Sequence, residues 1–183
     1  MTAAWKPTRA EIAAARGGKV ADLLAPGLDV LFCGINPSLY SAAIRHHFGR
    51  PGNRFWPALH GGGFTQRLLT PFEEKELLAE KCGITNLVAR ATATADELTD
   101  EELRAGTKML VRKVRRHRPR YIAFLGVTAY RTAFARPQAC LGPQAERLAD
   151  SGIWILPNPS GLNAHYQLAD LARLFAELRA TVT

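Results

Sequence analysis

The stretch VLFCGINPS, residues 30–38, joins an apolar run to a polar turn. Residues 30–33 are continuously apolar, which is typical of a strand that is buried on both faces. Gly34 ends this predicted strand, and a loop that contains Asn36 follows. Strands of this kind belong to parallel sheets that helices cover on both sides. The stretch therefore predicts an α/β fold with a polar loop at the end of a buried strand.

Similar short strands alternate with amphipathic helices along the rest of the chain. Further strands are predicted at 84–88, 121–125 and 153–156. This alternation indicates βαβ units, and hence a three-layer α/β/α sandwich around a mainly parallel, four-stranded sheet. Helices are predicted at 8–16, 53–59, 71–81, 99–118 and 128–134, followed by a last helix whose apolar face is formed by Leu168, Leu171, Leu174, Phe175 and Leu178.

The chain length of 183 residues suits one compact domain. Residues 1–26 are expected to form a helical segment that packs over the core of this domain. In open parallel sheets, ligands bind at the carboxyl ends of the strands, so we expect the loops after the four strands to share one edge. The functional site is predicted at that edge.

The charge balance favours a polyanionic partner. Lys and Arg number 24 against 16 Asp and Glu, which gives a net charge of +8. Neutralising phosphates with these cations would release condensed counterions, although a basic composition is also compatible with no such partner. No apolar run reaches the roughly 18 residues that a membrane span needs. We expect a monomeric cytoplasmic protein, associated with the nucleoid if it is bacterial.

Cys33, Cys82 and Cys140 are widely separated and odd in number. This spacing argues against a disulfide framework and against paired-cysteine zinc sites, and three cysteines cannot supply a four-cysteine iron-sulfur cluster. Buried free thiols are expected. No metal or organic cofactor is predicted, because no His and Cys cluster has ligand spacing.

Two of the predicted edge loops contain the same tripeptide, Asn36-Pro37-Ser38 and Asn158-Pro159-Ser160. Each could be an ordinary turn, but both fall at the predicted site. An asparagine amide has one acceptor oxygen and two donor hydrogens, so it can hold a water but cannot deprotonate it. Cleavage of an N-glycosidic bond suits such a group, because the oxocarbenium-like transition state needs no strong nucleophile.

The segments GINPS (34–38), NRFW (53–56) and NPSGL (158–162), with KCGITNLV (81–88) between them, resemble the mismatch-specific uracil-DNA glycosylase family, which includes the thymine-DNA glycosylases. The resemblance runs from about residue 31 to the last helix. It implies a monofunctional enzyme that flips uracil, or thymine or another modified pyrimidine, mainly opposite guanine, out of double-stranded DNA. Hydrolysis of the N-glycosidic bond would then initiate base excision repair.

The resemblance also implies residue roles. Asn36 would position the attacking water, Ile35 and Phe48 would contact the flipped base, and Asn158 would donate to the base carbonyl that gains charge. Leu162 would be the wedge that fills the gap in the base stack. Ser38 replaces a usual Gly, and Asn163, Ala164 and His165 replace a usual Ser and Arg. Predicted DNA contacts are Ser38, Arg54, Ser160, Gly161, Leu162 and Asn163, with Arg45, His46, His47 and Arg50 flanking the site.

Asp96 is a second catalytic candidate, because it follows the second predicted strand and could order or deprotonate the water. Such an Asp more often caps a turn. No lysine lies in the motif loops, so Schiff-base lyase chemistry is not expected. A non-catalytic module for damaged DNA and a small-ligand protein are alternatives. The basic run Lys113, Arg115, Arg116, Arg118 and Arg120 precedes the third strand and is placed at the opposite edge.

Overall fold

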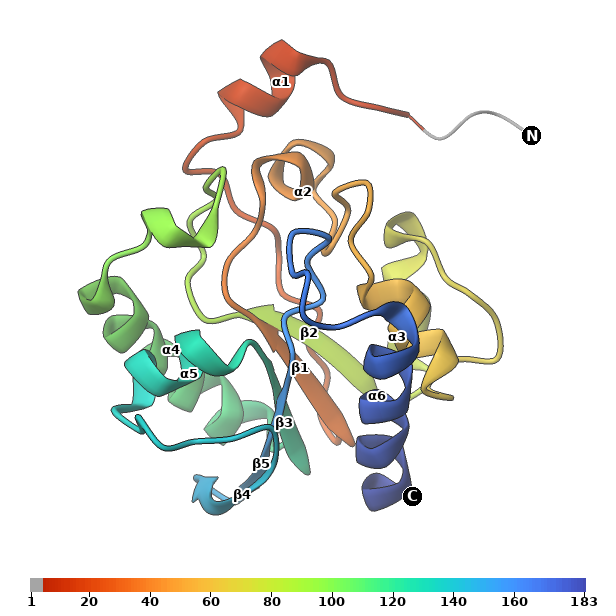
Figure 1. Cartoon of the computed structure of the whole chain (residues 1–183), viewed down its shortest axis with the longest axis vertical. Coiled ribbons are helices and arrows are strands. Elements are labelled where there is room, and N and C mark those ends of the chain that lie inside the picture. Colours follow the sequence, from red (N-terminus) through yellow and green to blue (C-terminus); the bar gives the residue numbers. More distant parts are fainter. Residues whose placement is uncertain (1–4) are drawn as a thin grey trace.

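The computed structural model describes residues 5–183 and has an α/β fold with a five-stranded sheet at its centre (Figure 1). The strand order is β2-β1-β3-β5-β4, and every neighbouring pair is parallel except β4 with β5. The strands are β1 (Val30–Gly34), β2 (Cys82–Asn86), β3 (Tyr121–Leu125), β4 (Gly142–Leu148) and β5 (Ser151–Leu156).

The prediction of four strands is wrong, because β4 is a fifth strand in the segment expected to be a loop. It pairs antiparallel with β5 at the edge of the sheet, with an irregularity between Pro143 and Arg147. None of its residues is fully buried. An edge strand with exposed residues needs no apolar run, so it carries no hydrophobic signal. β2 also begins and ends two residues earlier than the predicted strand at 84–88.

Helices cover both faces of the sheet (Figure 1). On one side, α3 (Phe55–Gly61) and α6 (Leu168–Val182) pack on alternate strand residues that include Phe32, whose ring contacts those of Phe55 and Phe175. On the other side lie α4 (Asp100–His117) and α5 (Val127–Phe134), against the residues that point the opposite way. Because strand side chains alternate between faces, β1, β3 and β5 each contribute to both hydrophobic cores, whereas the apolar side chains of β2 belong to the first alone.

The N-terminal segment adds little to either core. Helix α1 (Arg9–Ala14) begins with a capping box of Thr8 and Glu11 but buries none of its residues, so it does not cover the core, contrary to expectation. It contacts α2 (Leu39–Ile44) instead. Within the segment, Leu23 is buried and exchanges backbone hydrogen bonds with Ile84 of β2. Residues near Leu23, rather than α1, therefore join this segment to the sheet.

Two short 3-10 helices lie on either side of β2 in the chain. η1 (Pro71–Leu78), in the segment predicted to be a helix at 71–81, precedes β2 and has acidic residues in its first turn, and η2 (Ala95–Glu97) follows β2. A capping box of Thr99 and Glu102 begins α4. None of the helices among residues 5–183 is long and apolar enough to cross a membrane.

The three cysteines do not share one environment. Cys33 and Cys82 are buried free thiols, and burial raises the pKa of each to about 12. Cys140 is exposed, which corrects the expectation that all three are buried. It lies just before β4, in the segment whose strand the sequence did not reveal.

Candidate active site

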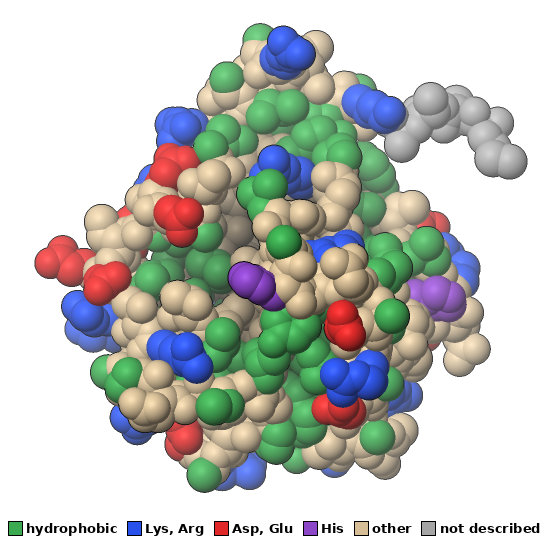
Figure 2. All heavy atoms as spheres, viewed as in Figure 1, with side chains coloured by type: hydrophobic (Ala, Val, Ile, Leu, Met, Phe, Trp, Pro, Cys, Tyr) green, Lys and Arg blue, Asp and Glu red, His purple; other side chains and the backbone are tan. Residues whose placement is uncertain are grey.

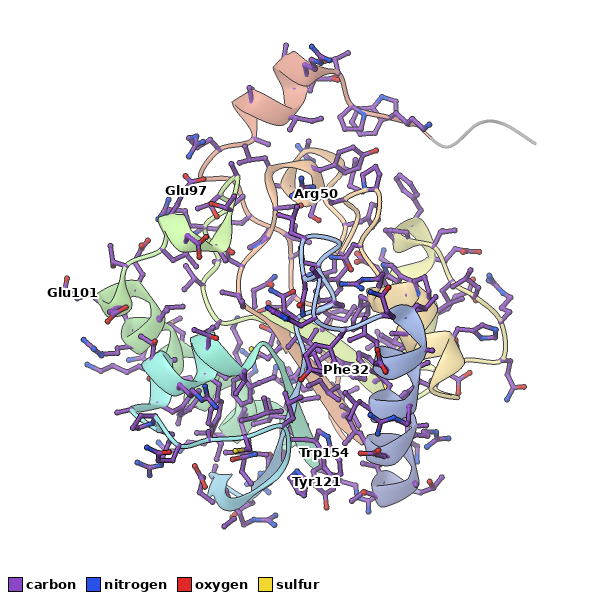
Figure 3. The ribbon with its side chains drawn as sticks, viewed as in Figure 1. Phe32, Arg50, Glu97, Glu101, Tyr121 and Trp154 are labelled. Carbon is purple, nitrogen blue, oxygen red and sulfur yellow. The ribbon has the colours of Figure 1, made fainter. Side chains whose placement is uncertain are left out.

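A cavity of about 550 Å³ opens at the carboxyl ends of β1, β2, β3 and β5. The space-filling view shows a hollow in the upper half of the visible face, with hydrophobic side chains at its floor (Figure 2). Arg50, labelled in Figure 3, lies at this end of the sheet. The cavity brings together the predicted site residues Ile35, Asn36, Ser38, Phe48, Asp96, Asn158, Ser160, Leu162 and Asn163, but Arg54 and Gly161 do not line it.

The amide of Asn36 is held in one orientation. Its Nδ2 donates to the carbonyl of Arg90 at 2.9 Å and to Oγ1 of Thr92 at 2.7 Å. A carbonyl can only accept, and the Thr92 hydroxyl already donates its hydrogen to the carbonyl of Thr94 at 2.7 Å. Nδ2 must therefore face this pair. Both donor hydrogens of Asn36 are used, and Oδ1 is left as an acceptor in the cavity.

Backbone hydrogen bonds fix the two loops that meet at Asn36. The N–H of Val88 donates to the carbonyl of Ile35 at 2.9 Å, and the N–H of Thr92 donates to that of Pro37 at 3.2 Å. The N–H of Leu39 in turn donates to the carbonyl of Thr92 at 3.1 Å. These bonds continue the pairing of β1 with β2 beyond the sheet. Asn36 and Thr92 therefore lie on one rigid support, although they are distant in sequence.

Ile35 and Asn158 approach each other above the end of β3. Gly126, which follows β3, has φ of 139°, and a Cβ there would lie 3.1 Å from Cδ1 of Ile35 and 3.8 Å from Cβ of Asn158. The Oδ1 of Asn158 accepts from the N–H of Ser160 at 3.0 Å. Its Nδ2 is therefore oriented away from that turn and is available to a ligand as a donor.

The ring of Phe48 forms one wall of the cavity. Phe48 has a left-handed backbone, φ 52°, which is uncommon for a bulky residue and costs on the order of 1–3 kcal/mol. Contacts on both sides hold it there: its ring stacks on Phe55 at a centroid distance of 4.0 Å, and the N–H of Gly49 donates to Oγ of Ser41. The flat ring is thus presented to the cavity beside Gly34, where a Cβ would lie 3.4 Å from the ring, in van der Waals contact, but only 2.6 Å from Oδ1 of Asn86.

Asn86, at the end of β2, is a cavity residue to which the sequence assigned no role. It is buried, and its Nδ2 lies 3.5 Å from Nδ1 of His47. Nε2 of His47 lies 2.9 Å from the carbonyl of Ala21 and must carry a hydrogen to donate to it. Burial lowers the pKa of His47 below its ordinary value of 6.5, so its Nδ1 is an acceptor at neutral pH. The amide oxygen of Asn86 then faces Gly34 and the cavity.

The loop from Asn158 to Tyr166 carries the predicted wedge. Leu162 is 66% exposed, an unusual position for a large apolar side chain at the mouth of a polar cavity. Short turns build the loop: the N–H of Leu162 donates to Oγ of Ser160, and Nδ2 of Asn163 donates to the carbonyl of Asn158. Gly161 leaves no room for a Cβ, which would lie 2.7 Å from the carbonyl oxygen of Gly52.

Arg54 supports this loop from below. Its guanidinium donates to the carbonyls of Ser160 at 2.6 Å and Asn163 at 2.8 Å, and also to the carbonyl of Tyr166. Its backbone N–H donates to the carbonyl of Pro159 at 2.9 Å. The predicted role as a phosphate contact is therefore wrong for Arg54, because its guanidinium hydrogens are directed into the protein.

The other predicted DNA contacts divide into engaged and free side chains. His47 is buried, and Nδ1 of His46 lies 3.0 Å from a carboxylate oxygen of Glu74. Both histidines are thus engaged within the protein, which contradicts the expectation that they contact DNA. The hydroxyl of Ser38 caps α2 by accepting from the N–H of Ser41. Arg45 and Arg50 are exposed cations. Arg50 lines the cavity and Arg45 does not.

Asp96 lies at the rim of the cavity, in η2, and is exposed. Within the described part of the chain its carboxylate forms no hydrogen bond or ion pair, and the capping residue of this turn is Glu97, whose carboxylate accepts from the N–H of Thr94. Glu97, and not Asp96, is therefore the residue that caps this turn. Asp96 remains available to a ligand at the rim of the cavity.

The described cavity therefore combines an amide acceptor in a fixed orientation and a second amide that can donate. An aromatic ring forms one wall, and an exposed leucine lies at the mouth. The model of the Uracil DNA glycosylase superfamily matches residues 21–179 of the chain. The chain belongs to the uracil DNA glycosylase superfamily. Members of this superfamily are DNA glycosylases, which act on DNA and hydrolyse N-glycosyl compounds.

A solved structure gives the same assignment of the fold. The chain is similar to a protein from Methanosarcina acetivorans that is provisionally named a uracil DNA glycosylase and whose structure was determined in solution by NMR. The TM-score is 0.56 and the sequence identity is 21%, over 89% of this chain and 98% of that one. At this identity the likeness extends to the fold alone.

The sequence pattern indicated no role for Thr92 or Asn86, and it indicated a DNA contact for Arg54. Asn86, inside the segment KCGITNLV, is the last residue of β2, but the strand predicted at 84–88 placed it in mid-strand and so hid its position at the site edge. Thr92 had no signal in the sequence, because its role depends on a hydrogen bond to a residue 56 positions away. The charge of Arg54 favoured a phosphate contact, but its guanidinium donates to three backbone carbonyls of the wedge loop.

Proposed function

We propose that the protein is a monofunctional, mismatch-type uracil-DNA glycosylase that removes uracil from double-stranded DNA. The observation that carries this proposal is the fixed amide of Asn36, whose Oδ1 is free in the cavity while both hydrogens of Nδ2 are bound. Such an amide can accept a hydrogen bond from a water and orient its oxygen toward a substrate. It offers no donor that would compete with that water.

The flipped base fits between Phe48 and the two other amides of the cavity. Phe48 would stack on the base, and stacking of this kind contributes about 1–3 kcal/mol. Nδ2 of Asn158 would donate to a base carbonyl, where negative charge accumulates as the glycosidic bond breaks. Asn86 faces the same cavity and would contact another polar edge of the base. One amide donor and one amide acceptor suit a pyrimidine that has a carbonyl group beside a ring N–H, such as uracil.

The bond-breaking step needs little help from a base. The N-glycosidic bond breaks with its electron pair on the departing pyrimidine, and the sugar becomes an oxocarbenium-like cation. The water held at Asn36 then forms the new bond to C1′ and loses a proton, giving free base and an abasic site. Asp96 is our second candidate for a catalytic role, because its exposed carboxylate at the rim can accept that proton directly or through a second water.

We infer hydrolysis without a lyase step. Among the residues that line the cavity in the described chain, none is a lysine, so no amine is positioned to form a Schiff base with C1′. The product would remain an intact strand with an abasic site. Initiation of base excision repair is the corresponding biological role.

Binding to duplex DNA follows from the mouth of the cavity. Leu162 is exposed on a rigid loop and would enter the stack when the base leaves it. Ser160, Gly161 and Asn163 of the same loop, with Ser38 and Arg50, would contact the neighbouring backbone. We propose that guanine is preferred opposite the lesion. The protein would act as a monomer, since one chain supplies every group named here.

The test is incubation with a duplex that contains one G·U pair, followed by alkali, which breaks the strand at abasic sites. We expect cleavage at the uracil position, and an intact strand when alkali is left out. Parallel duplexes with A·U, G·T and ethenocytosine define the base range. Tight binding without cleavage after many hours with excess protein would instead establish a non-catalytic module for damaged DNA.

A further inference from the structure

A second cavity lies at the opposite end of the sheet from the candidate active site. Its volume is about 590 Å³, and it is lined by residues 114–115, 118–121, 147 and 149–151. Figure 3 labels Tyr121 at this end and Arg50 at the other. Since β3 has five residues, the ends of the sheet are about 16 Å apart at roughly 3.3 Å per residue. The two cavities are therefore separate sites.

Four arginines from separate elements converge on this second cavity, which we call the arginine cavity. They are Arg115 in α4, Arg118 and Arg120 between α4 and β3, and Arg147 in β4. All four are exposed. By contrast, Arg50 is the single Lys or Arg residue that lines the candidate active site among residues 5–183. The cations that could hold a polyanion are thus concentrated away from the proposed catalytic edge.

Little of this positive charge is neutralised within the described chain. Arg115 and Arg118 form no ion pair there, and Arg147 donates to the backbone carbonyl of Asp150. Arg120 pairs with Asp29 at 3.3 Å. The carboxylate of Asp150 is the one acidic side chain among the lining residues. Four cations around one cavity repel each other, so a bound anion would relieve that repulsion.

Favourable interaction with the helix dipole does not account for this arrangement. Only Arg115 belongs to the last turn of α4, whereas Arg120 and Arg147 are contributed by strands or their flanks. Lys113 of the same basic run has a different role, because its ammonium binds Asp22 at 2.7 Å and Thr85 at 3.0 Å. The basic run therefore contains one cation that is bound within the protein, Lys113, and three that line the arginine cavity, Arg115, Arg118 and Arg120, whereas Arg116 does neither.

The lining of the arginine cavity indicates which anion it suits. Guanidinium groups bind phosphate through paired N–H donors. Two other polar side chains of the lining are engaged within the protein: the hydroxyl of Ser151 donates to the carbonyl of Pro119, and the ring of Tyr121 packs on Gly152, where a Cβ would lie 2.6 Å from it. Four guanidinium groups against the single carboxylate of Asp150 therefore favour phosphates, and phosphate contacts carry no sequence information.

We propose that the arginine cavity binds the phosphate backbone of a second DNA segment, without regard to sequence or damage, while the first segment occupies the active-site edge. The choice of DNA rests on the proposed function. One protein would then bridge two duplexes or two distant parts of one DNA molecule. On long DNA it would move between segments without full release. Excision from a short duplex would not need this second contact.

The experiment compares the parent protein with Arg115→Gln/Arg118→Gln/Arg147→Gln. The matched control removes three exposed cations outside both cavities, Lys19→Gln/Lys75→Gln/Lys108→Gln. Binding of a short, undamaged duplex is followed by sedimentation at several salt concentrations, and single-turnover excision is measured on a short G·U duplex. Inorganic tripolyphosphate is titrated in a separate arm, because free phosphate compounds share the chemistry of the backbone.

We expect two duplexes per parent or control molecule and one per arginine variant, with excision unchanged. The salt dependence of the second binding event should correspond to about 0.9 per phosphate contact in the slope of log K against log salt, and this event should be absent in the arginine variant. Equal stoichiometry and slope in all three proteins would overturn the proposal. Binding of tripolyphosphate without a second duplex would overturn it in favour of a free phosphate ligand. If the proposed function alone fails, no protein excises uracil, yet the arginine-dependent binding persists.

Discussion

Oγ1 of Thr92 accepts a hydrogen bond from Nδ2 of Asn36 at 2.7 Å and donates its own hydrogen to the carbonyl of Thr94. This direction of donation leaves the Asn36 amide one orientation, with its oxygen in the cavity. Thr92 is 1% exposed, so it acts on the substrate through Asn36 and not by contact. It is a positioning residue.

Replacement of Thr92 by Val keeps the shape of the side chain but removes the hydroxyl. We expect the single-turnover excision rate to fall about tenfold, since one buried hydrogen bond of about 1–1.5 kcal/mol no longer orients the amide. Thr92→Ser restores the hydroxyl and should recover most of the rate. Equal rates for the Val and Ser variants would mean that Arg90 alone holds Asn36.

Asn36→Ala removes the water acceptor itself. Excision should fall by a factor of at least about 100, as it does when a single preorganised polar group is removed from other active sites. Binding to DNA that already contains an abasic site should change little, because the wedge loop is untouched; fluorescence anisotropy measures it. Full activity in this variant would transfer the catalytic role elsewhere, and Asp96→Asn would be tested next.

Arg54→Lys tests the support of the wedge loop. A lysine ammonium cannot satisfy three separate carbonyls from the position of the guanidinium. We expect a loss of roughly 2 kcal/mol in the free energy of unfolding in urea, with faster proteolysis between residues 158 and 166. Arg50→Lys, at an exposed position, is the control and should unfold like the parent.

Leu162→Ala should weaken excision selectively on paired DNA. Only a duplex leaves a gap to be filled, so we expect a loss on the order of tenfold on a G·U duplex and little change on a single strand with the same sequence. The comparison uses single-turnover rates for both substrates. An equal loss on both would show that Leu162 contacts the base or sugar and does not act as a wedge.

His47 makes stability depend on pH in a definite direction. Burial is the largest cause that lowers its folded pKa, below the 6.5 of a free histidine. Between these two pKa values the unfolded chain binds a proton that the folded chain does not, so the free energy of unfolding falls as the pH is lowered through 6.5. Urea unfolding at pH 7.5 and 5.5 measures this fall.

The matched variant for this test is His47→Gln, which keeps a polar side chain but does not titrate. The fall in stability between the two pH values should be smaller in this variant than in the parent. Excision by the parent should decline only where the pH falls below the folded pKa of His47, since a protonated Nδ1 can no longer accept from Asn86. If the stability of His47→Gln fell with pH as much as that of the parent, groups other than His47 would be responsible for the fall.

The sequence was informative where a residue's fate depends on its immediate neighbours. Val30 to Cys33 form a strand because a continuous apolar run is stable only inside a covered sheet, and Thr99 with Glu102 begins α4 because their side chains reach each other's backbone. The strand β4 could not be predicted, because its immediate neighbours in the sequence do not determine its structure. Its residues are exposed at an edge, where pairing with β5 depends on no hydrophobic pattern of its own.

By itself, then, the sequence determined the α/β class, the edge that carries the site and the presence of Asn36 there, because hydrophobic periodicity and strand order are properties of local segments. The tertiary structure alone decided which way the Asn36 amide points, that Arg54 holds a loop instead of a phosphate, and that four arginines share a second cavity. These are contacts between residues far apart in the chain. Hydrogen-bond direction and burial arise only when such residues pack together.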